Sequence, residues 1–157
     1  MRSVRLIRGR HNPVTQNRYQ NHQKAHGFSK WLILERDSGI AIGESGLLVL
    51  PEYGWVDLGF RFAQPHWGKG LATEVASAWV REALDEFRVG QLGAFAHPKN
   101  LASIRALEKV GFHAERRDKV RGMDSIVFFL DAKLVNSCPR KEVVSARLPI
   151  PAAAESP

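Results

Sequence analysis

The chain has 157 residues, of which 44% are hydrophobic, and it carries a formal net charge of +7. This length suits one domain with a real core, and no stretch reaches the roughly 18 consecutive apolar residues that a membrane-spanning helix needs. The single cysteine, Cys138, excludes an internal disulfide framework and a multi-cysteine metal site. We therefore expect a reducing, cytoplasmic location.

The positive charge is concentrated near the N-terminus, because residues 1–34 contain no acidic side chain. Their basic residues are Arg2, Arg5, Arg8, Arg10, Arg18, Lys24 and Lys30. Such a segment could bind nucleic acid, phosphate or an acidic surface, and its composition shares features with organelle transit peptides. We favour a solvated basic face and consider nucleic acid a less favoured partner, because long basic stretches serve solvation more often than recognition.

Three strands are predicted in the first half of the chain. Residues 31–36 and 40–50 are rich in apolar and branched side chains, and the turn residues at 37–39 between them favour a hairpin. A second turn at 51–54 leads into residues 55–62, another run of aromatic and branched side chains. Together these segments predict an antiparallel meander.

Residues 71–87 give the strongest helix signal in the chain, because apolar side chains recur there at helical spacing. This stripe comprises Leu71, Ala72, Val75, Ala76, Trp79, Val80, Ala83, Leu84 and Phe87. It predicts an amphipathic helix that packs on the sheet.

A second strand-to-helix unit follows at residues 91–97 and 100–111, where Asn100 can cap the helix and Gly111 can end it. The predicted buried face of this helix is Leu101, Ile104, Leu107 and Val110. Residues from 112 onward and 124–130 supply two closing strands. The proline- and alanine-rich residues 135–157 are expected to form a disordered tail.

The sequence GKGLAT at residues 68–73 lies where a strand turns into a helix. Gly68 and Gly70 lack side chains that would block an anion, and the first amide groups of a helix point outward at the positive end of its dipole. This geometry predicts phosphate binding, with Lys69 able to add charge, but two such glycines also fit a tight turn without a ligand. No G-K-[ST] ending indicates a P-loop, and no third glycine with a βαβ repeat indicates a dinucleotide fold.

Two longer segments resemble the GNAT N-acetyltransferase superfamily, in particular the branch of ribosomal-protein alanine N-acetyltransferases. WVDLGFRFAQPHWGKGLATEV is similar to motif A of that branch and HPKNLASIRALEKVGF to its motif B. The resemblance implies an α/β domain over residues 29–134, with a mixed, mostly antiparallel sheet flanked by helices. It also implies that the usual N-terminal strand and helix are missing, with residues 1–28 left as a remnant of the acceptor-side helices. In the alternative, VRLIRG at residues 4–9 supplies a short substitute strand.

The resemblance further implies acetyl-coenzyme A as the co-substrate. Its pyrophosphate would bind the amides of the loop and first helical turn, which are those of Gly68, Lys69, Gly70, Leu71, Ala72 and Thr73. Its pantetheine arm would pair with the strand end near Arg61 and Phe62. Asn100 matches an asparagine that commonly holds this arm in the family.

A direct attack by an amine on the thioester needs a group that removes a proton and a group that protonates the leaving thiolate. The resemblance places Asp57 as the candidate base, with Glu44 as the alternative, and Ser103 as the candidate acid. The tyrosine that many family members carry one turn further is replaced by Leu107.

The sequence leaves several functions open. The leading hypothesis is transfer of an acetyl group to a primary amine, either a protein N-terminus or a small molecule, with a homodimer possible. The alternatives are a coenzyme A-binding module without catalysis and a nucleic-acid-binding protein. His66, His97 and His113 have no metal-ligand spacing, and Trp67 is expected to pack against the domain.

Overall fold

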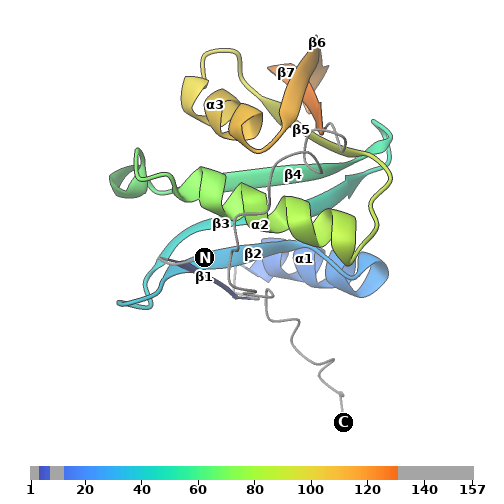
Figure 1. Ribbon diagram of the computed structural model, residues 1–157. Coiled ribbons are helices and arrows are strands. Elements are labelled where there is room, and N and C mark those ends of the chain that lie inside the picture. The colour runs from blue at the N-terminus through green and yellow to red at the C-terminus, as the bar shows by residue number, and fades with distance from the viewer. Residues whose placement is uncertain (1–3, 8–12, 131–157) are drawn as a thin grey trace.

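The computed structural model describes residues 4–7 and 13–130, and the predicted tail lies outside this part (Figure 1). Seven strands, three α-helices and one 3₁₀ turn follow each other along the described chain. They are β1 (Val4–Ile7), α1 (Pro13–His26), β2 (Lys30–Glu35), β3 (Ala41–Leu50), β4 (Trp55–Phe62), η1 (Gln64–His66), α2 (Leu71–Asp85), β5 (Leu92–Ala96), α3 (Leu101–Lys109), β6 (Phe112–Val120) and β7 (Met123–Leu130).

All seven strands form one sheet in the order β1-β2-β3-β4-β5-β7-β6. Every neighbouring pair is antiparallel except β4 and β5, which are parallel because α2 carries the chain back between them. The predicted mixed, mostly antiparallel sheet flanked by helices is therefore confirmed. None of the helices in the described part is long and apolar enough to span a bilayer.

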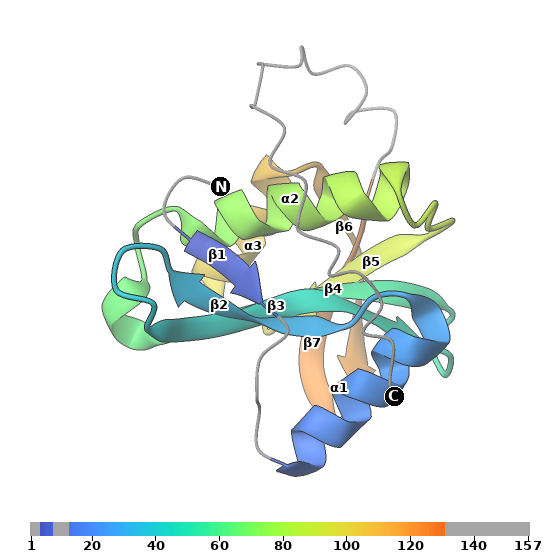
Figure 2. The same ribbon diagram turned by 90° about the horizontal axis from the view of Figure 1, so that it is seen from below.

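Helices α2 and α3 lie on one face of the sheet, whereas α1 lies on the other (Figure 2). The predicted apolar stripe of α2 is confirmed: Val75, Ala76, Trp79 and Ala83 are buried against the sheet. Trp79 packs edge-on against Trp31 of β2, with ring centroids 5.6 Å apart. This face holds the larger of the two apolar cores.

The opposite face of the sheet has a smaller apolar core, which contains Trp55. The buried members of this core come from the ends of β3 and β4 and from the β6–β7 hairpin, and Tyr19 of α1 packs beside them. They are Leu48, Leu50, Trp55, Val120, Val127 and Phe129.

One part of the predicted fold is corrected at the N-terminus. The N-terminal strand and helix are not missing: Val4 and Leu6 of β1 are buried, and the strand pairs along its length with β2. The 14-residue helix α1 follows. Alternating apolar residues in VRLI fit a half-buried edge strand, although four residues are too short for a firm prediction from sequence.

His22 fixes α1 to the sheet through both of its ring nitrogens. The amide of Val49 donates to Nε2 at 2.9 Å, and Nδ1 lies 2.8 Å from the carbonyl oxygen of Phe28. Since Nε2 must accept, Nδ1 carries the proton and donates to Phe28. Burial is the main cause that lowers the pKa of His22 below its usual value.

The prediction for the buried face of α3 was wrong at one position. Leu107 is buried and Ile104 packs against the core, but Leu101 is 56% exposed. Leu101 is the first residue of the helix, and it is exposed together with Ala102, whereas burial begins further along the helix. Ala106 is buried in its place.

Candidate functional site

The parallel strands β4 and β5 pair over a short distance only. Val56 faces Leu92 and Asp57 faces Gly93, and no later β4 residue has a partner on β5 within the described sheet. From Leu58 to Phe62 the strand is held by β3 alone. The sheet therefore opens beside Gly59, with main-chain groups of β4 available to a ligand that could add like a strand.

The chain turns at the end of β4 into the N-terminus of α2, as the sequence predicted. Gly68 and Gly70 have φ values of 75° and 74°, which favour glycine, and Gly70 is the N-cap without a side-chain cap. A β-carbon at either position would meet open space. Among the described residues, the amides from Gly68 to Thr73 have no backbone acceptor, whereas Glu74 N bonds to Gly70 O.

These amides lie in the turn and first residues of α2, at the positive end of the helix dipole, where a negative charge is stabilised. Lys69 is exposed beside it, whereas the side chain of Leu71 points into the core. Binding of a pyrophosphate by these residues stays a prediction, but the geometry required for it is present.

Trp67 does not pack into the domain as expected. Its side chain is 64% exposed, and its indole Nε1 donates to the carbonyl oxygen of Phe62 at 2.8 Å. One lone pair of the Phe62 carbonyl at the end of β4 is thus already used, so a ligand arm along this strand would share that oxygen or use other main-chain groups.

Asp57 is buried on the α1 face at the point where β4 and β5 separate. Asp57 is only 5% exposed, and its Oδ1 accepts a hydrogen bond from Nε1 of Trp55 at 3.5 Å. Burial raises the pKa of Asp57 to about 7, and the charge of Lys30 and the bond from Trp55 partly oppose this rise. The carboxyl can therefore gain and lose a proton near neutral pH.

Lys30 was missed by sequence reasoning. A β-carbon placed on Gly59 would lie 2.9 Å from its Nζ and 3.9 Å from Oδ2 of Asp57, so both groups meet above Gly59. Burial lowers the pKa of Lys30, against the opposing charges of Asp57 and Glu44. The sequence signal was weak: Lys30 alternates with Trp31, but only the strand register shows what it faces.

Glu44, the alternative base, is engaged differently. Its side chain is 12% exposed and accepts a hydrogen bond from Arg61 at 2.7 Å. The two residues are cross-strand neighbours on β3 and β4. Arg61 is largely exposed, so it presents its guanidinium at the rim while Glu44 lies deeper.

Asn100 and Ser103 lie at the first turn of α3. The Asn100 side-chain oxygen accepts from the amide of Ser103 at 3.2 Å, which confirms the predicted helix cap. The roles of Asn100 in holding a ligand and of Ser103 as an acid stay predictions. Leu107, which replaces the tyrosine of many family members, is buried.

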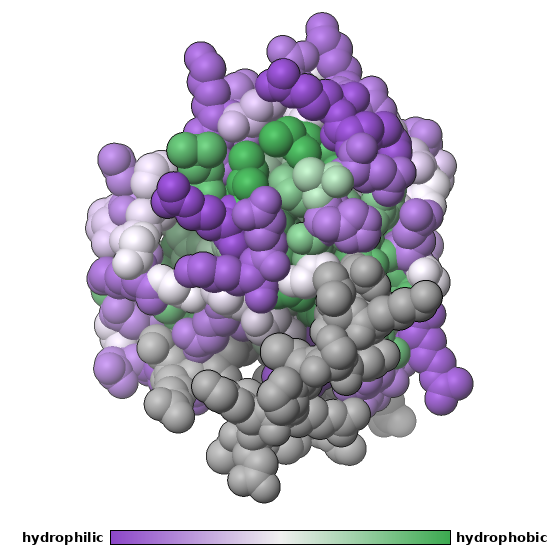
Figure 3. All heavy atoms as spheres, turned by 45° about the horizontal axis from the view of Figure 1, so that its top comes forward, coloured by the Kyte–Doolittle hydropathy of each residue, from purple (hydrophilic) through white to green (hydrophobic). Residues whose placement is uncertain are grey.

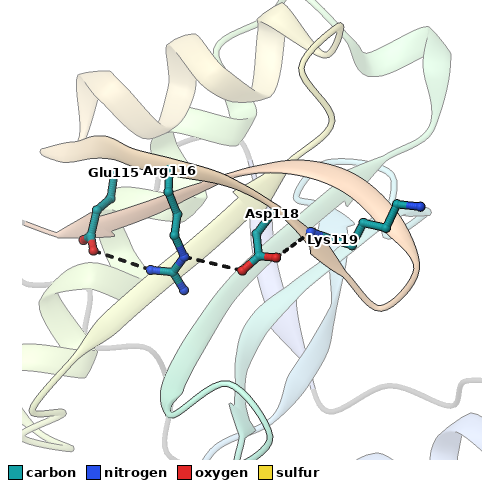
Figure 4. A network of polar contacts seen from close by, with 4 residues as sticks. All are labelled: Glu115, Arg116, Asp118 and Lys119. Carbon is teal, nitrogen blue, oxygen red and sulfur yellow. Dashed lines mark hydrogen bonds and ion pairs between the residues drawn. The ribbon is translucent and has the colours of Figure 1, made fainter.

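The β6–β7 hairpin forms a polar wall on the α1 side. The Arg116 guanidinium lies 5.9 Å from the Trp55 ring and 6.0 Å from the Phe129 ring, within cation–π range. Along β6, Arg116 contacts Glu115 and Asp118, and Asp118 accepts from the amide of Lys119 (Figure 4). These contacts hold Arg116 over the ring that donates to Asp57.

The surface at the α3 end of the molecule combines apolar and polar areas. When this end is turned forward, apolar side chains gather at the centre and polar side chains surround them (Figure 3). An apolar area with a polar rim is typical of a binding surface.

The likeness to known proteins covers most of the chain. Residues 4–113 match the family model described as "Acetyltransferase (GNAT) domain". The uncharacterized protein YkkB of Bacillus subtilis is 33% identical over 96 residues, which are 60% of this chain and 56% of that protein. The chain spans about half the length of the curated relatives it matches.

Solved structures share the fold at low identity. A putative GnaT-family acetyltransferase from Bordetella pertussis has a TM-score of 0.69 and 21% identity, with 75% of this chain and 74% of that chain covered. A ribosomal-protein-S5-alanine acetyltransferase from Vibrio fischeri has a TM-score of 0.65 and 14% identity, with 74% and 68% covered. From the family match and the shared fold it follows that the chain belongs to the GNAT acetyltransferase family.

Proposed function

We propose that the protein is an N-acetyltransferase that transfers the acetyl group of acetyl-coenzyme A to a primary amine. The observation that carries this proposal is the combination of two features: a row of amides from Gly68 to Thr73 without a backbone acceptor in the described chain, and the opening between β4 and β5. The row of amides supplies an anion site. The opening leaves the edge of β4 available for main-chain pairing with a ligand. The buried Asp57 lies where that edge begins.

The residues present fit acetyl-coenzyme A. The amides of the turn and the positive end of α2 suit its pyrophosphate, and the open space beside Gly68 and Gly70 admits a bulky anion. The main chain near Arg61 and Phe62 suits an amide-bearing arm, and Asn100 caps the N-terminus of α3. When bound, acetyl-coenzyme A supplies the activated acyl group.

Asp57 is the stronger candidate for the base. A base works best with a pKa near the operating pH, and burial raises the pKa of Asp57 to about 7. Glu44 already accepts a hydrogen bond from Arg61. Asp57 therefore takes the amine proton, and Ser103 is the proposed donor to the leaving sulfur.

A pair of variants at one position tests the anion site. Thr73 is the third residue of α2, where a glutamate is compatible with the helix dipole, so Thr73→Glu should fold while placing a negative charge beside the amides. Thr73→Gln is the neutral control of the same shape. In calorimetric titration with acetyl-coenzyme A, we expect binding to weaken at least about tenfold more in Thr73→Glu than in Thr73→Gln.

The same titration can overturn the proposal. Equal binding by the two variants would show that the phosphates bind elsewhere, and no binding by the folded parent would remove the enzyme assignment. Where binding is retained, a screen of primary amines, including peptide N-termini and small amines, measures release of free coenzyme A thiol. Asp57→Asn should slow this release by about 10²-fold to 10⁴-fold.

The acceptor itself is proposed only as a class. Similarity to the Vibrio fischeri enzyme, which is named a ribosomal-protein-S5-alanine acetyltransferase, supports testing a protein N-terminus first. Small amines are the second group. Strands β1 and β6 are the two edges of the described sheet, and an edge strand is where a second copy could pair. Sedimentation analysis would detect such a homodimer.

A further inference from the structure

The side chain of Lys30 extends from β2 over β3 to β4 on the α1 face of the sheet. The register aligns Lys30 of β2 with Gly46 of β3, and Gly46 with Gly59 of β4. Because neither glycine carries a side chain, the row between them is open, and Nζ of Lys30 reaches the surface of Gly59. Residues paired across strands share a face of the sheet, so this arrangement follows from the register.

The amine of Lys30 ends beside the candidate base. Its Nζ and Oδ2 of Asp57 both lie within 4 Å of the same point above Gly59, at 2.9 Å and 3.9 Å. Lys30 takes part in none of the ion pairs formed within residues 4–7 and 13–130. It is therefore an amine that is close to a carboxylate without being locked in a salt bridge.

This position is also the start of the opening in the sheet. Gly59 is the second β4 residue beyond the last pairing with β5, and an acceptor amine must come close to this edge if the proposed function is correct. Lys30 thus presents a primary amine where an external amine would have to be.

The surroundings favour a reactive amine. Burial is the main cause that lowers the pKa of Lys30, and Arg61 and Arg121 act in the same direction against Asp57 and Glu44. A lowered pKa increases the fraction of neutral amine, which is the nucleophilic form.

We propose that Lys30 is a self-acetylation site of this protein, an inference that rests on the proposed function. The neutral Nζ of Lys30 attacks the carbonyl carbon of an acyl-coenzyme A thioester, an N–C amide bond forms and the C–S bond breaks. One Nζ proton passes through a water molecule to Asp57, and the sulfur leaves as the thiolate of coenzyme A, which then takes up a proton.

Acetylation would change the site in two ways. It removes the cationic charge that lowers the pKa of Asp57, so that carboxyl holds its proton to higher pH. It also places an acetyl group above Gly59, where the external acceptor must enter. Both changes reduce turnover of other amines, so the modification inhibits the enzyme.

Mass spectrometry of the full chain tests this proposal. The purified protein is incubated with acetyl-coenzyme A, and acetylation of each lysine is followed by peptide mapping. The exposed Lys24, Lys99 and Lys109 report the background of direct chemical acetylation. Because the amine is held beside the opening, we expect Lys30 to react roughly 10²-fold faster than these exposed lysines.

Two variants separate the site from its surroundings. Lys30→Arg keeps the positive charge but cannot form the amide, so the fast phase should disappear from the intact mass. Asp57→Asn should slow acetylation of Lys30 by about 10²-fold or more and leave the exposed lysines unchanged. Circular dichroism checks that both variants remain folded.

The outcomes distinguish this proposal from the assignment of the enzyme. Acetylation of Lys30 at the rate of the exposed lysines, or none at all, in a protein that binds acetyl-coenzyme A and acetylates an added amine overturns the self-acetylation alone. Absence of acetyl-coenzyme A binding by calorimetry overturns both. Fast modification of Lys30 that persists unchanged in Asp57→Asn contradicts the assigned role of the carboxylate in the step.

Discussion

The two faces of the sheet differ in what their buried side chains do. On the α2 face, the core around Val75, Trp79 and Trp31 is apolar. On the α1 face, a smaller core stands beside the buried Asp57 and the amine of Lys30. Burying a charged group lowers the free energy of unfolding, whereas burying a hydrocarbon side chain raises it. The comparison teaches that the first face stabilises the domain, while the second accepts a cost in stability for its chemistry.

The largest effect on stability is expected from a cavity in the core of the α2 face. Trp79 is 1% exposed, so Trp79→Ala leaves a cavity and should lower the free energy of unfolding by about 3–5 kcal/mol. Trp67→Ala is the control, because this exposed ring loses only its hydrogen bond to Phe62 and should cost about 1 kcal/mol. Urea denaturation measures both, and equal losses would contradict the placement of Trp79 in the core of the α2 face.

Asp57→Asn should have the opposite sign on the α1 face. The folded-state pKa of Asp57 is raised to about 7, so its contribution to stability is complete below the unfolded pKa of about 4 and is lost as pH rises through 7. At pH 8 the parent therefore buries a charge that the variant lacks. We expect Asp57→Asn to be more stable by on the order of 2 kcal/mol at pH 8.

Urea midpoints at pH 5 and pH 8 check this sign. The gain from Asp57→Asn should shrink at pH 5, where the parent carboxyl is protonated. A loss of stability at both pH values would show that Asp57 holds the fold together instead of serving the reaction.

His22 tests how firmly α1 is held on the chemical face. His22→Ala leaves the amide of Val49 without its acceptor and should lower the free energy of unfolding by about 1–3 kcal/mol. The pKa of His22 is lowered in the folded state, so its contribution is present above the unfolded pKa of about 6.5 and is lost as pH falls through the folded pKa.

Urea denaturation between pH 7.5 and pH 5 measures this effect in the parent and the variant. The difference between them should be largest at neutral pH and should decrease on acidification. A difference that does not change with pH would show that His22 acts through packing alone.

The smallest effect on stability is expected at Arg116 in the β6–β7 hairpin. Arg116 lies over Trp55 and Phe129 and pairs with exposed acids, so Arg116→Met should change stability by less than about 1 kcal/mol. Its removal exposes Trp55, so a change in the fluorescence of the tryptophans is the more sensitive measurement. An unchanged spectrum would contradict the cation–π placement.

Several features of the site could be read from short stretches of sequence. The spacing of Val75, Ala76 and Trp79 predicted the buried face of α2, and Asn100 predicted the cap of α3. The glycines at 68 and 70 predicted the turn into α2. These features depend on residues a few positions apart, and local backbone geometry decides them.

Other features came only from the tertiary structure. Nothing local shows that Leu101 is exposed or that Trp67 bonds to Phe62. The apolar alternation at residues 4–7 allows a strand, but only the pairing of β1 with β2 shows that it completes the sheet. The exposure of a helix end depends on how far the sheet reaches, and a bond between a loop and a strand end depends on the path of the chain. Such contacts have no periodic pattern in the sequence.

The sequence by itself determined the order of the elements from residue 31 onward, the family motifs and the glycine turn into α2, because each rests on neighbouring residues. The tertiary structure decided the meeting of Lys30, Gly59 and Asp57. That meeting requires the register of β2, β3 and β4 to bring Lys30 across two glycines, and the end of the β4–β5 pairing to fall at Asp57. Strand register is set by the packing of the whole sheet, so this site exists only once the sheet has formed.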